Sequence, residues 1–208
     1  MSGARQEHWD YVYATKRADK VSWFQDEPAP SLAMIAAAGI GHDDAIVDVG
    51  GGASVLVDRL LDDGYSNLTV LDVSQTGVEA SRARLASRSE RITWVVQDVV
   101  AWQPSQGAFK LWHDRAVFHF LTDDADRRGY LRALDLGLQQ GGYLILAPFA
   151  PTGPERCSGL PVQRYSGQTM QATLGPGYQL IEEQPQTHLT PAGNRQDFTW
   201  CLFRKATD

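Results

Sequence analysis

Cysteine is scarce in this sequence. Only Cys157 and Cys201 occur, and neither lies in a Cys or His spacing typical of a metal site. A disulfide framework and a bound metal are therefore not indicated, and we expect a reducing compartment. The sequence also lacks an apolar run of the roughly 20 residues that span a bilayer, and residues 1–8 lack the apolar segment of a signal peptide. These absences predict a cytoplasmic protein that does not enter a membrane.

An excess of basic residues is also missing. There are 19 Lys and Arg against 25 Asp and Glu, which gives a net charge of -6. Binding to nucleic acid or to anionic lipid depends on clustered positive charge, so we expect neither as a partner. The length of 208 residues, 43% of them hydrophobic, suits one substantial core. We therefore expect residues 1–208 to form a single domain.

Short apolar runs alternate with helix-like segments from Ala45 onward, which predicts an α/β fold with a mainly parallel sheet. The expected helices cover 54–61, 74–87 and 123–140, with Ser54, Ser74 and Thr122 at their starts. Two later β-type runs, joined by a turn at 190–194, predict a closing antiparallel hairpin. The expected strands are 45–49, 67–73, 92–96, 109–113 and 143–149, followed by 178–188 and 196–204.

Three strand ends carry residues suited to a nucleotide-type cofactor. Gly50, Gly51 and Gly52 permit a tight turn that leads to the free N–H groups of a helix, although such a turn can be a simple connection. Asp72 can accept hydrogen bonds from both hydroxyls of a ribose, or cap a helix. Asp98 ends the third strand at the same sheet edge, where it can accept from an adenine amino group. The three together predict a cofactor site.

The segments 47–54, 71–74 and 97–99 resemble the successive motifs of class I methyltransferases, which use S-adenosylmethionine (SAM). The resemblance implies a three-layer Rossmann-like sandwich whose seven-stranded sheet is mainly parallel and ends in an antiparallel hairpin. It also implies that the glycine turn holds the methionine part of SAM, that Asp72 holds the ribose and that Asp98 contacts adenine. The cofactor-binding residues implied in these segments are Asp48, Gly50, Gly51, Gly52, Ser54, Asp72, Val73, Asp98 and Val99.

A nicotinamide dinucleotide is the competing cofactor. Its fingerprint requires Gly or Ala three residues after the second glycine of the turn, so that the helix packs closely on the strand. Val55 occupies that position here. The β-branched side chain and the closing hairpin favour SAM.

The segment 111–121 corresponds to the methyl-transfer side of the site in this family. We predict that Asp114 faces the cofactor end and takes part in catalysis. His119 is predicted either to remove a proton from the acceptor or only to pack at the start of a helix. Arg115 is a candidate for binding an acidic substrate group, but pairing with Asp114 is the favoured interpretation.

Residues 1–27 resemble the leading segment of a subgroup that includes protein-lysine methyltransferases and small bacterial relatives. The resemblance implies that this segment covers SAM, with Tyr13 and Trp23 against it; an amphipathic helix that completes the core is the alternative. The segment 151–165 is predicted to be a substrate-side loop in which Cys157 is an ordinary loop residue. The substrate candidates here and in the hairpin turn are Arg156, Arg164 and Arg195.

We therefore expect a SAM-dependent methyltransferase that acts on an O, N or S nucleophile of a small molecule. Two alternatives remain open. One is a protein-lysine methyltransferase, to which the acidic net charge is suited because it would attract a basic protein substrate. The other is a SAM-binding regulatory protein without transferase activity. The sequence does not predict an oligomeric state.

Overall fold

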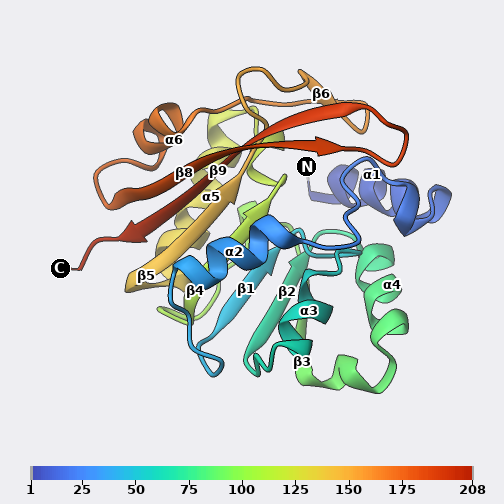
Figure 1. Ribbon diagram of the computed structural model, residues 1–208, viewed down its shortest axis with the longest axis horizontal. Coiled ribbons are helices and arrows are strands. Elements are labelled where there is room, and N and C mark those ends of the chain that lie inside the picture. Colours follow the sequence, from blue (N-terminus) through green and yellow to red (C-terminus); the bar gives the residue numbers. More distant parts are fainter. Residues whose placement is uncertain (1, 208) are drawn as a thin grey trace.

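Helices on both faces of a seven-stranded sheet form three layers in the computed structural model, which describes residues 2–207 (Figure 1). The predicted three-layer, Rossmann-like α/β fold is confirmed. The strands of the sheet are β1 (Ile46–Val49), β2 (Leu68–Asp72), β3 (Ile92–Val96), β4 (Phe109–Arg115), β5 (Leu138–Ala147), β8 (Tyr178–Leu189) and β9 (Arg195–Lys205). The helices are α1 (Ser2–Thr15), α2 (Ala29–Ala37), α3 (Leu56–Asp62), α4 (Gln75–Leu85), α5 (Asp124–Gly137) and α6 (Gly167–Leu174).

The strands follow the order β3-β2-β1-β4-β5-β9-β8. The first five are parallel, and β9 runs antiparallel to both β5 and β8. The chain moves outward through β1, β2 and β3, then returns to the other side of β1 with β4. This change of direction between β1 and β4 is the place where open α/β sheets bind ligands, at the carboxyl ends of the strands.

Two apolar clusters fill the spaces on the two faces of the sheet. One contains Met34 and Ile35 of α2 with Leu56 and Leu60 of α3. The other contains side chains of α5 and α6, such as Tyr130 and Met170. Strand side chains alternate between the two faces, so neighbouring residues of one strand enter different clusters. Because of this alternation, side chains of adjacent residues on β4 cannot meet on the same face of the sheet.

Several element ends differ from the sequence prediction. Helix α3 begins at Leu56, after Ser54, although Oγ of Ser54 does accept a hydrogen bond from the Leu56 N–H. Asp123 rather than Thr122 immediately precedes α5. Residues 138–140, expected to be helical, already belong to β5. Helix α4 is capped by Ser74 as predicted, and it ends at Leu85 because Ala86 adopts a positive φ of 51°.

Short elements complete the fold. The segment after β5 forms a small hairpin of β6 (Arg156–Cys157) and β7 (Leu160–Pro161). Four 3-10 turns are η1 (Ala18–Lys20), η2 (Ala86–Arg91), η3 (Val99–Ala101) and η4 (Phe118–Phe120). Among residues 2–207, no helix is long and apolar enough to cross a membrane.

Candidate active site

The glycine turn after β1 is a site where side chains would not fit. Gly50 has a positive φ of 75°, and a Cβ added there would lie 2.1 Å from Cγ2 of Val117. At Gly51 and Gly52 an added Cβ would meet the carboxylates of Asp48 and Asp72 at 2.4 and 2.5 Å. The glycines therefore let the backbone pass next to two acidic side chains and leave room in front of them.

Asp72 ends β2 and is held by this turn. Its Oδ2 accepts from the Gly52 N–H at 2.9 Å, and its Oδ1 accepts from the Ser74 N–H at 2.8 Å. Burial raises the pKa of the Asp72 carboxyl to about 6, against the effect of these two hydrogen bonds. Each carboxylate oxygen can accept more than one hydrogen bond, so both remain able to accept from ribose hydroxyls.

Asp48 is fixed from the opposite side. His113 Nδ1 donates to Oδ1 of Asp48 at 2.8 Å, and His113 Nε2 lies 3.0 Å from Oγ of Ser31. Oδ2 of Asp48 is buried and has no hydrogen-bond partner within the described part of the chain. This oxygen is free to accept from a cationic group, as the ammonium of a bound methionine moiety would require.

Helix α1 lies across the sheet edge and closes the site. Asp10 accepts from Oγ of Ser74 at 2.6 Å and from the Thr76 N–H at 3.0 Å, which fixes α1 to the N-terminus of α4. Arg5 forms an ion pair with Asp98 at 2.5 Å. The other Asp98 oxygen accepts from the Val100 N–H at 3.2 Å. Asp98, the residue predicted to contact adenine, is therefore already bound by the N-terminal helix.

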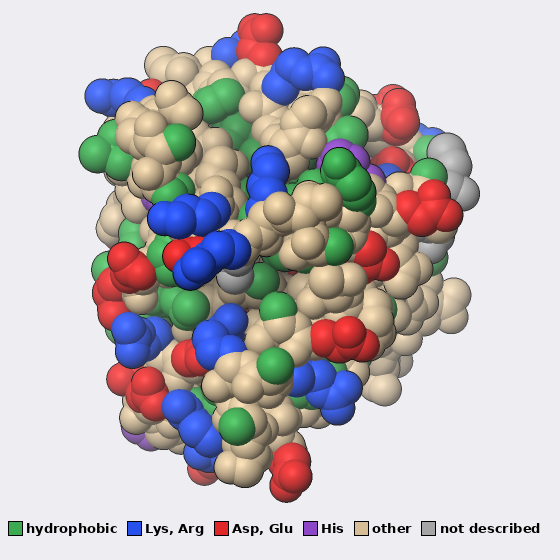
Figure 2. Space-filling view, turned by 90° about the vertical axis from the view of Figure 1, so that its right-hand side faces the viewer, with side chains coloured by type: hydrophobic (Ala, Val, Ile, Leu, Met, Phe, Trp, Pro, Cys, Tyr) green, Lys and Arg blue, Asp and Glu red, His purple; other side chains and the backbone are tan. Residues whose placement is uncertain are grey.

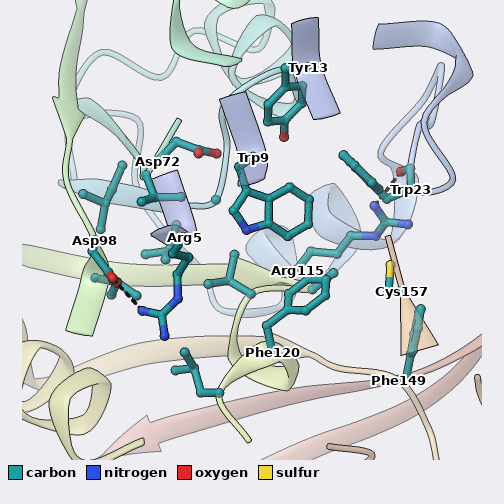
Figure 3. A pocket seen from close by; sticks show the side chains of 18 of the residues that line it. Arg5, Trp9, Tyr13, Trp23, Asp72, Asp98, Arg115, Phe120, Phe149 and Cys157 are labelled. Atoms are coloured by element: carbon teal, nitrogen blue, oxygen red, sulfur yellow. Dashed lines mark hydrogen bonds and ion pairs between the residues drawn. The ribbon is translucent and has the colours of Figure 1, made fainter. Parts of the chain in front are cut away.

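A pocket with about 810 Å³ of empty space, part of it open to solvent, runs along this edge (Figure 3). Asp72, Val73, Asp98 and Val99 line one end of it. Tyr13, Trp23 and Gly50 also line it. A smaller hollow adjoins it, lined by Asp48, Gly51 and Ser54, and the two share Trp23, Val49, Gly50 and Arg115. Gly52 lines neither hollow but donates to Asp72.

Aromatic side chains of the N-terminal segment form the roof of the pocket. The ring centroid of Trp9 lies 5.7 Å from that of Trp23 and 5.0 Å from that of Phe120, and both pairs pack edge to face. The ring centroids of Tyr13 and Trp23 are 6.0 Å apart. Figure 3 shows Trp9 between Asp72 on one side and Arg115 on the other. Aromatic faces exclude water and interact favourably with a sulfonium cation.

Arg115 does not pair with Asp114, and the favoured sequence interpretation is wrong at this point. The two residues are neighbours on β4, so their side chains point to opposite faces of the sheet. Asp114 faces α5, where Tyr130 Oη donates to it at 2.7 Å and the N–H groups of Val117 and Phe118 also bind it. Asp114 is absent from the lining of both hollows. Its predicted catalytic role has no support in this placement.

The Arg115 guanidinium instead enters the pocket. Nη1 donates to the carbonyl of Trp23 at 2.8 Å. The guanidinium also stacks on Phe198, with its Cζ 4.8 Å from the ring centroid. Nε and Nη2 are buried and have no hydrogen-bond partner among residues 2–207. Burial lowers the pKa of Arg115 to about 10, so the group stays protonated at neutral pH.

His119 is buried on η4 beside the pocket. Its Nδ1 accepts from the Phe149 N–H at 3.2 Å, so the ring proton of the neutral form is on Nε2. Burial, with Arg115 as a further cause, lowers the pKa of His119 to about 3. The ring does not line the pocket. A neutral ring with its lone pair already bound is poorly suited to remove a proton, so packing is the better supported of the two predicted roles.

The three other substrate arginines lie outside the pocket lining. Arg156 donates to the Gly159 carbonyl, Arg164 to Glu155 and the Gly153 carbonyl, and Arg195 to Asp197. The segment 151–165 nevertheless reaches the site through Cys157, which the sequence interpretation treated as an ordinary loop residue. Cys157 lines the pocket, and burial raises the pKa of its thiol.

Several lining residues were missed from the sequence. Arg5 and Trp9 recur with Tyr13 at intervals of four, which places them on one face of a helix, and this spacing would have identified them. Phe149 follows β5, and Gln196 and Phe198 lie on β9; nothing in their local sequence marks them as lining residues. Within residues 2–207, no cluster of three or more His, Cys, Asp or Glu side chains is arranged to hold a metal ion.

A glycine turn, two acidic strand ends and an aromatic roof at the switch point of a mainly parallel sheet define a Rossmann-like site for an adenosyl cofactor. Comparison with known proteins points to the same class. Residues 46–142, slightly less than half of the chain, match the family described as "Methyltransferase domain". This match and the geometry of the site support a class I methyltransferase, the class that takes its methyl group from SAM.

Two similar curated proteins are both named EEF1A lysine methyltransferase 2. The one from Danio rerio is 22% identical over 98% of this chain and 87% of its own length. The one from Homo sapiens is 22% identical over 86% of this chain and 76% of its own length.

Solved structures share the fold at low sequence identity. A structure from a study of the conversion of a disulfide bond into a thioacetal group during echinomycin biosynthesis has a TM-score of 0.76 at 20% identity, over 97% of this chain and 93% of the other. A Burkholderia thailandensis 1,6-didemethyltoxoflavin-N1-methyltransferase, with bound 1,6-didemethyltoxoflavin and S-adenosylhomocysteine (SAH), has a TM-score of 0.75 at 19% identity. The match covers 99% of this chain and 89% of the other.

Proposed function

We propose that this methyltransferase acts on an O, N or S nucleophile of a small molecule. The observation that carries the proposal is the buried guanidinium of Arg115, at the end of the pocket opposite Asp98, whose Nε and Nη2 have no hydrogen-bond partner among residues 2–207. A lysine ammonium entering this end would meet a second cation in a region of low dielectric constant, which is unfavourable. A neutral or anionic small molecule would not meet this repulsion between two cations.

The residues of the chain give the cofactor its place and orientation. Asp72 would accept from the ribose hydroxyls, Asp98 and the backbone of Val99 would hold the adenine, and Asp48 with the glycine turn would hold the methionine part. Bound SAM supplies an electrophilic methyl group on a positively charged sulfur. Asp48, Asp72 and Asp98 thereby keep the roles assigned to them by resemblance, as part of this proposal.

Transfer would depend on positioning and on exclusion of water. Trp9, Tyr13 and Trp23 cover the pocket, while Phe149 and Phe198 close its far wall. His119 and Asp114 are assigned positioning roles, because each already binds backbone N–H groups and neither lines the pocket. The acceptor would therefore arrive with its nucleophile already deprotonated or intrinsically neutral.

Protein-lysine methylation is the second candidate, favoured by the similarity to EEF1A lysine methyltransferase 2 over nearly the whole chain. The face seen in Figure 2, on the side of α1 and α4, carries acidic and basic side chains interspersed. Mixed charge of this kind provides no large field of one sign to attract a basic protein. The third candidate is a SAM-binding regulatory protein without transferase activity.

Label transfer separates these candidates. The purified protein is incubated with methyl-labelled SAM and either a small-metabolite extract or a protein extract, with Asp72→Ala as the control for cofactor-dependent labelling. We expect label in the metabolite fraction only. Label in the protein fraction would favour lysine methylation, and label in neither would favour the regulatory protein. The cytoplasmic location and the single-domain organisation stay predictions.

A further inference from the structure

We propose that Arg115 binds a carboxylate of the methyl acceptor and that the amide oxygen of Gln196 accepts from a hydroxyl or amino group of the same molecule, so that the acceptor is a small, planar organic acid. The inference deepens the proposed function and rests on it, because it concerns the acceptor end of the same pocket. It specifies the substrate class, which neither the family nor the similar proteins define for this chain.

The first support is the set of donors that Arg115 leaves free. Nη1 is bound to the Trp23 carbonyl, whereas Nε and Nη2 have no partner in the described part of the protein. Nε and Nη2 lie along one edge of the planar guanidinium, and this edge donates two parallel hydrogen bonds to the two oxygens of a carboxylate. Leaving buried charged donors unpaired is costly, so a ligand that satisfies both would bind strongly.

The second support is independent and comes from β9. Gln196 is 7% exposed and lines the pocket, and its Oε1 is buried without a partner among residues 2–207. An amide oxygen accepts a hydrogen bond from a hydroxyl or amino group. A ligand that carries such a donor in addition to its carboxylate would satisfy Arg115 and Gln196 together.

The walls between these groups indicate a planar ligand. Phe198 stacks on the Arg115 guanidinium at 4.8 Å, and Phe149 packs against Phe198 with ring centroids 4.9 Å apart. Both rings line the pocket. The neutral thiol of Cys157 adds a polarizable surface without a competing negative charge.

The position in the sheet favours the acceptor over the carboxylate of SAM itself. Gly50 and Asp98 follow β1 and β3, and Asp72 ends β2, all on one side of β4. Gln196 lies on β9, beyond β4 in the other direction, and Cys157 lies on β6 of the small separate hairpin. Figure 3 shows the Arg115 guanidinium pointing away from Asp72 and Asp98, toward Trp23 and Cys157.

Binding of paired acids and amides tests the inference. With the protein saturated with SAH, calorimetry compares benzoate, nicotinate and 1-naphthoate with their neutral primary amides. In the wild type we expect at least one acid to bind tenfold or more tightly than its amide. Arg115→Met should abolish this preference, whereas Arg195→Met, which removes an exposed arginine outside the pocket, should retain it.

Three results would overturn the inference: no acid preference in any pair, a preference that survives Arg115→Met, or SAH binding more than tenfold weaker in Arg115→Met. The last would assign Arg115 to the carboxylate of the cofactor. Normal SAH binding without acid preference would overturn this inference alone. Failure of the wild type to bind SAH would overturn the proposed function as well.

Gln196→Glu provides a second variant that keeps the Arg115 to Trp23 hydrogen bond. A carboxylate at position 196 would add a negative charge to the lining of the same pocket and repel an acidic ligand. We expect this variant to bind acid and amide equally, with SAH affinity unchanged. If Gln196→Glu prefers acids over amides as strongly as the wild type does, a site formed by Arg115 and Gln196 together is contradicted. This test holds even where Arg115→Met does not fold.

Discussion

At the scale of single residues, His119 shows how burial decides a role. A histidine in this segment can act as a base or as packing, and the hydrogen bond from Phe149 with complete burial favours packing. The pKa of about 3 keeps the folded protein from binding a proton there, while the unfolded chain binds one below about pH 6.5. The contribution of the neutral His119 ring to the free energy of unfolding is therefore fully present above about pH 6.5, and it is lost as the pH falls toward the pKa of the folded state.

Replacement of His119 by Asn tests this account. The Asn variant can keep an acceptor for the Phe149 N–H but does not titrate. We expect label transfer to metabolites within twofold of the wild type, and a wild-type unfolding free energy that decreases relative to the variant by about 1.4 kcal/mol per pH unit below pH 6. Urea unfolding at pH 5 and pH 7.5 measures the second effect. A loss of transfer of 100-fold or more would restore His119 as a general base.

At the scale of elements, helix α1 is the part that turns an open sheet edge into a covered pocket. Arg5, Trp9 and Tyr13 form one of its faces, and Asp10 fixes the helix to α4. The sequence predicted a covering segment but did not define its helix or the residues facing inward. The aromatic content indicated burial, whereas the docking partner at the N-terminus of α4 depends on the fold.

Asp10→Ala tests the covering role of α1. The change removes the acceptor for Ser74 Oγ and the Thr76 N–H, a contact worth about 1 kcal/mol, so SAH affinity should fall about three- to tenfold. Tryptophan emission should shift to the red as Trp9 becomes more exposed. Glu7→Ala, an exposed acid on the same helix, is the matched control and should bind SAH normally. Equal affinity in both variants would show that the docking of α1 does not support the cofactor site.

At the scale of the whole molecule, the cofactor side was predictable and the acceptor side was not. Gly50, Asp72 and Asp98 each lie at or just after the end of a strand, at a recognisable sequence distance, so local pattern places them together. Arg115, Cys157 and Gln196 line one pocket only because β4, β6 and β9 converge in three dimensions. The expected pairing of Arg115 with Asp114 failed for a local reason, since strand geometry sends adjacent side chains to opposite faces.

The most direct test of the account is calorimetry of SAH binding to the wild type and to Asp72→Ala, at pH 8 and pH 5. Because burial raises the pKa of Asp72 to about 6, the carboxylate is ionised at pH 8 and mostly protonated at pH 5. Wild-type affinity should therefore fall about tenfold between the two values. Asp72→Ala should bind more than tenfold more weakly at pH 8 and lose this pH dependence. Equal affinity of the two proteins at pH 8 would contradict the assignment of this pocket to SAM.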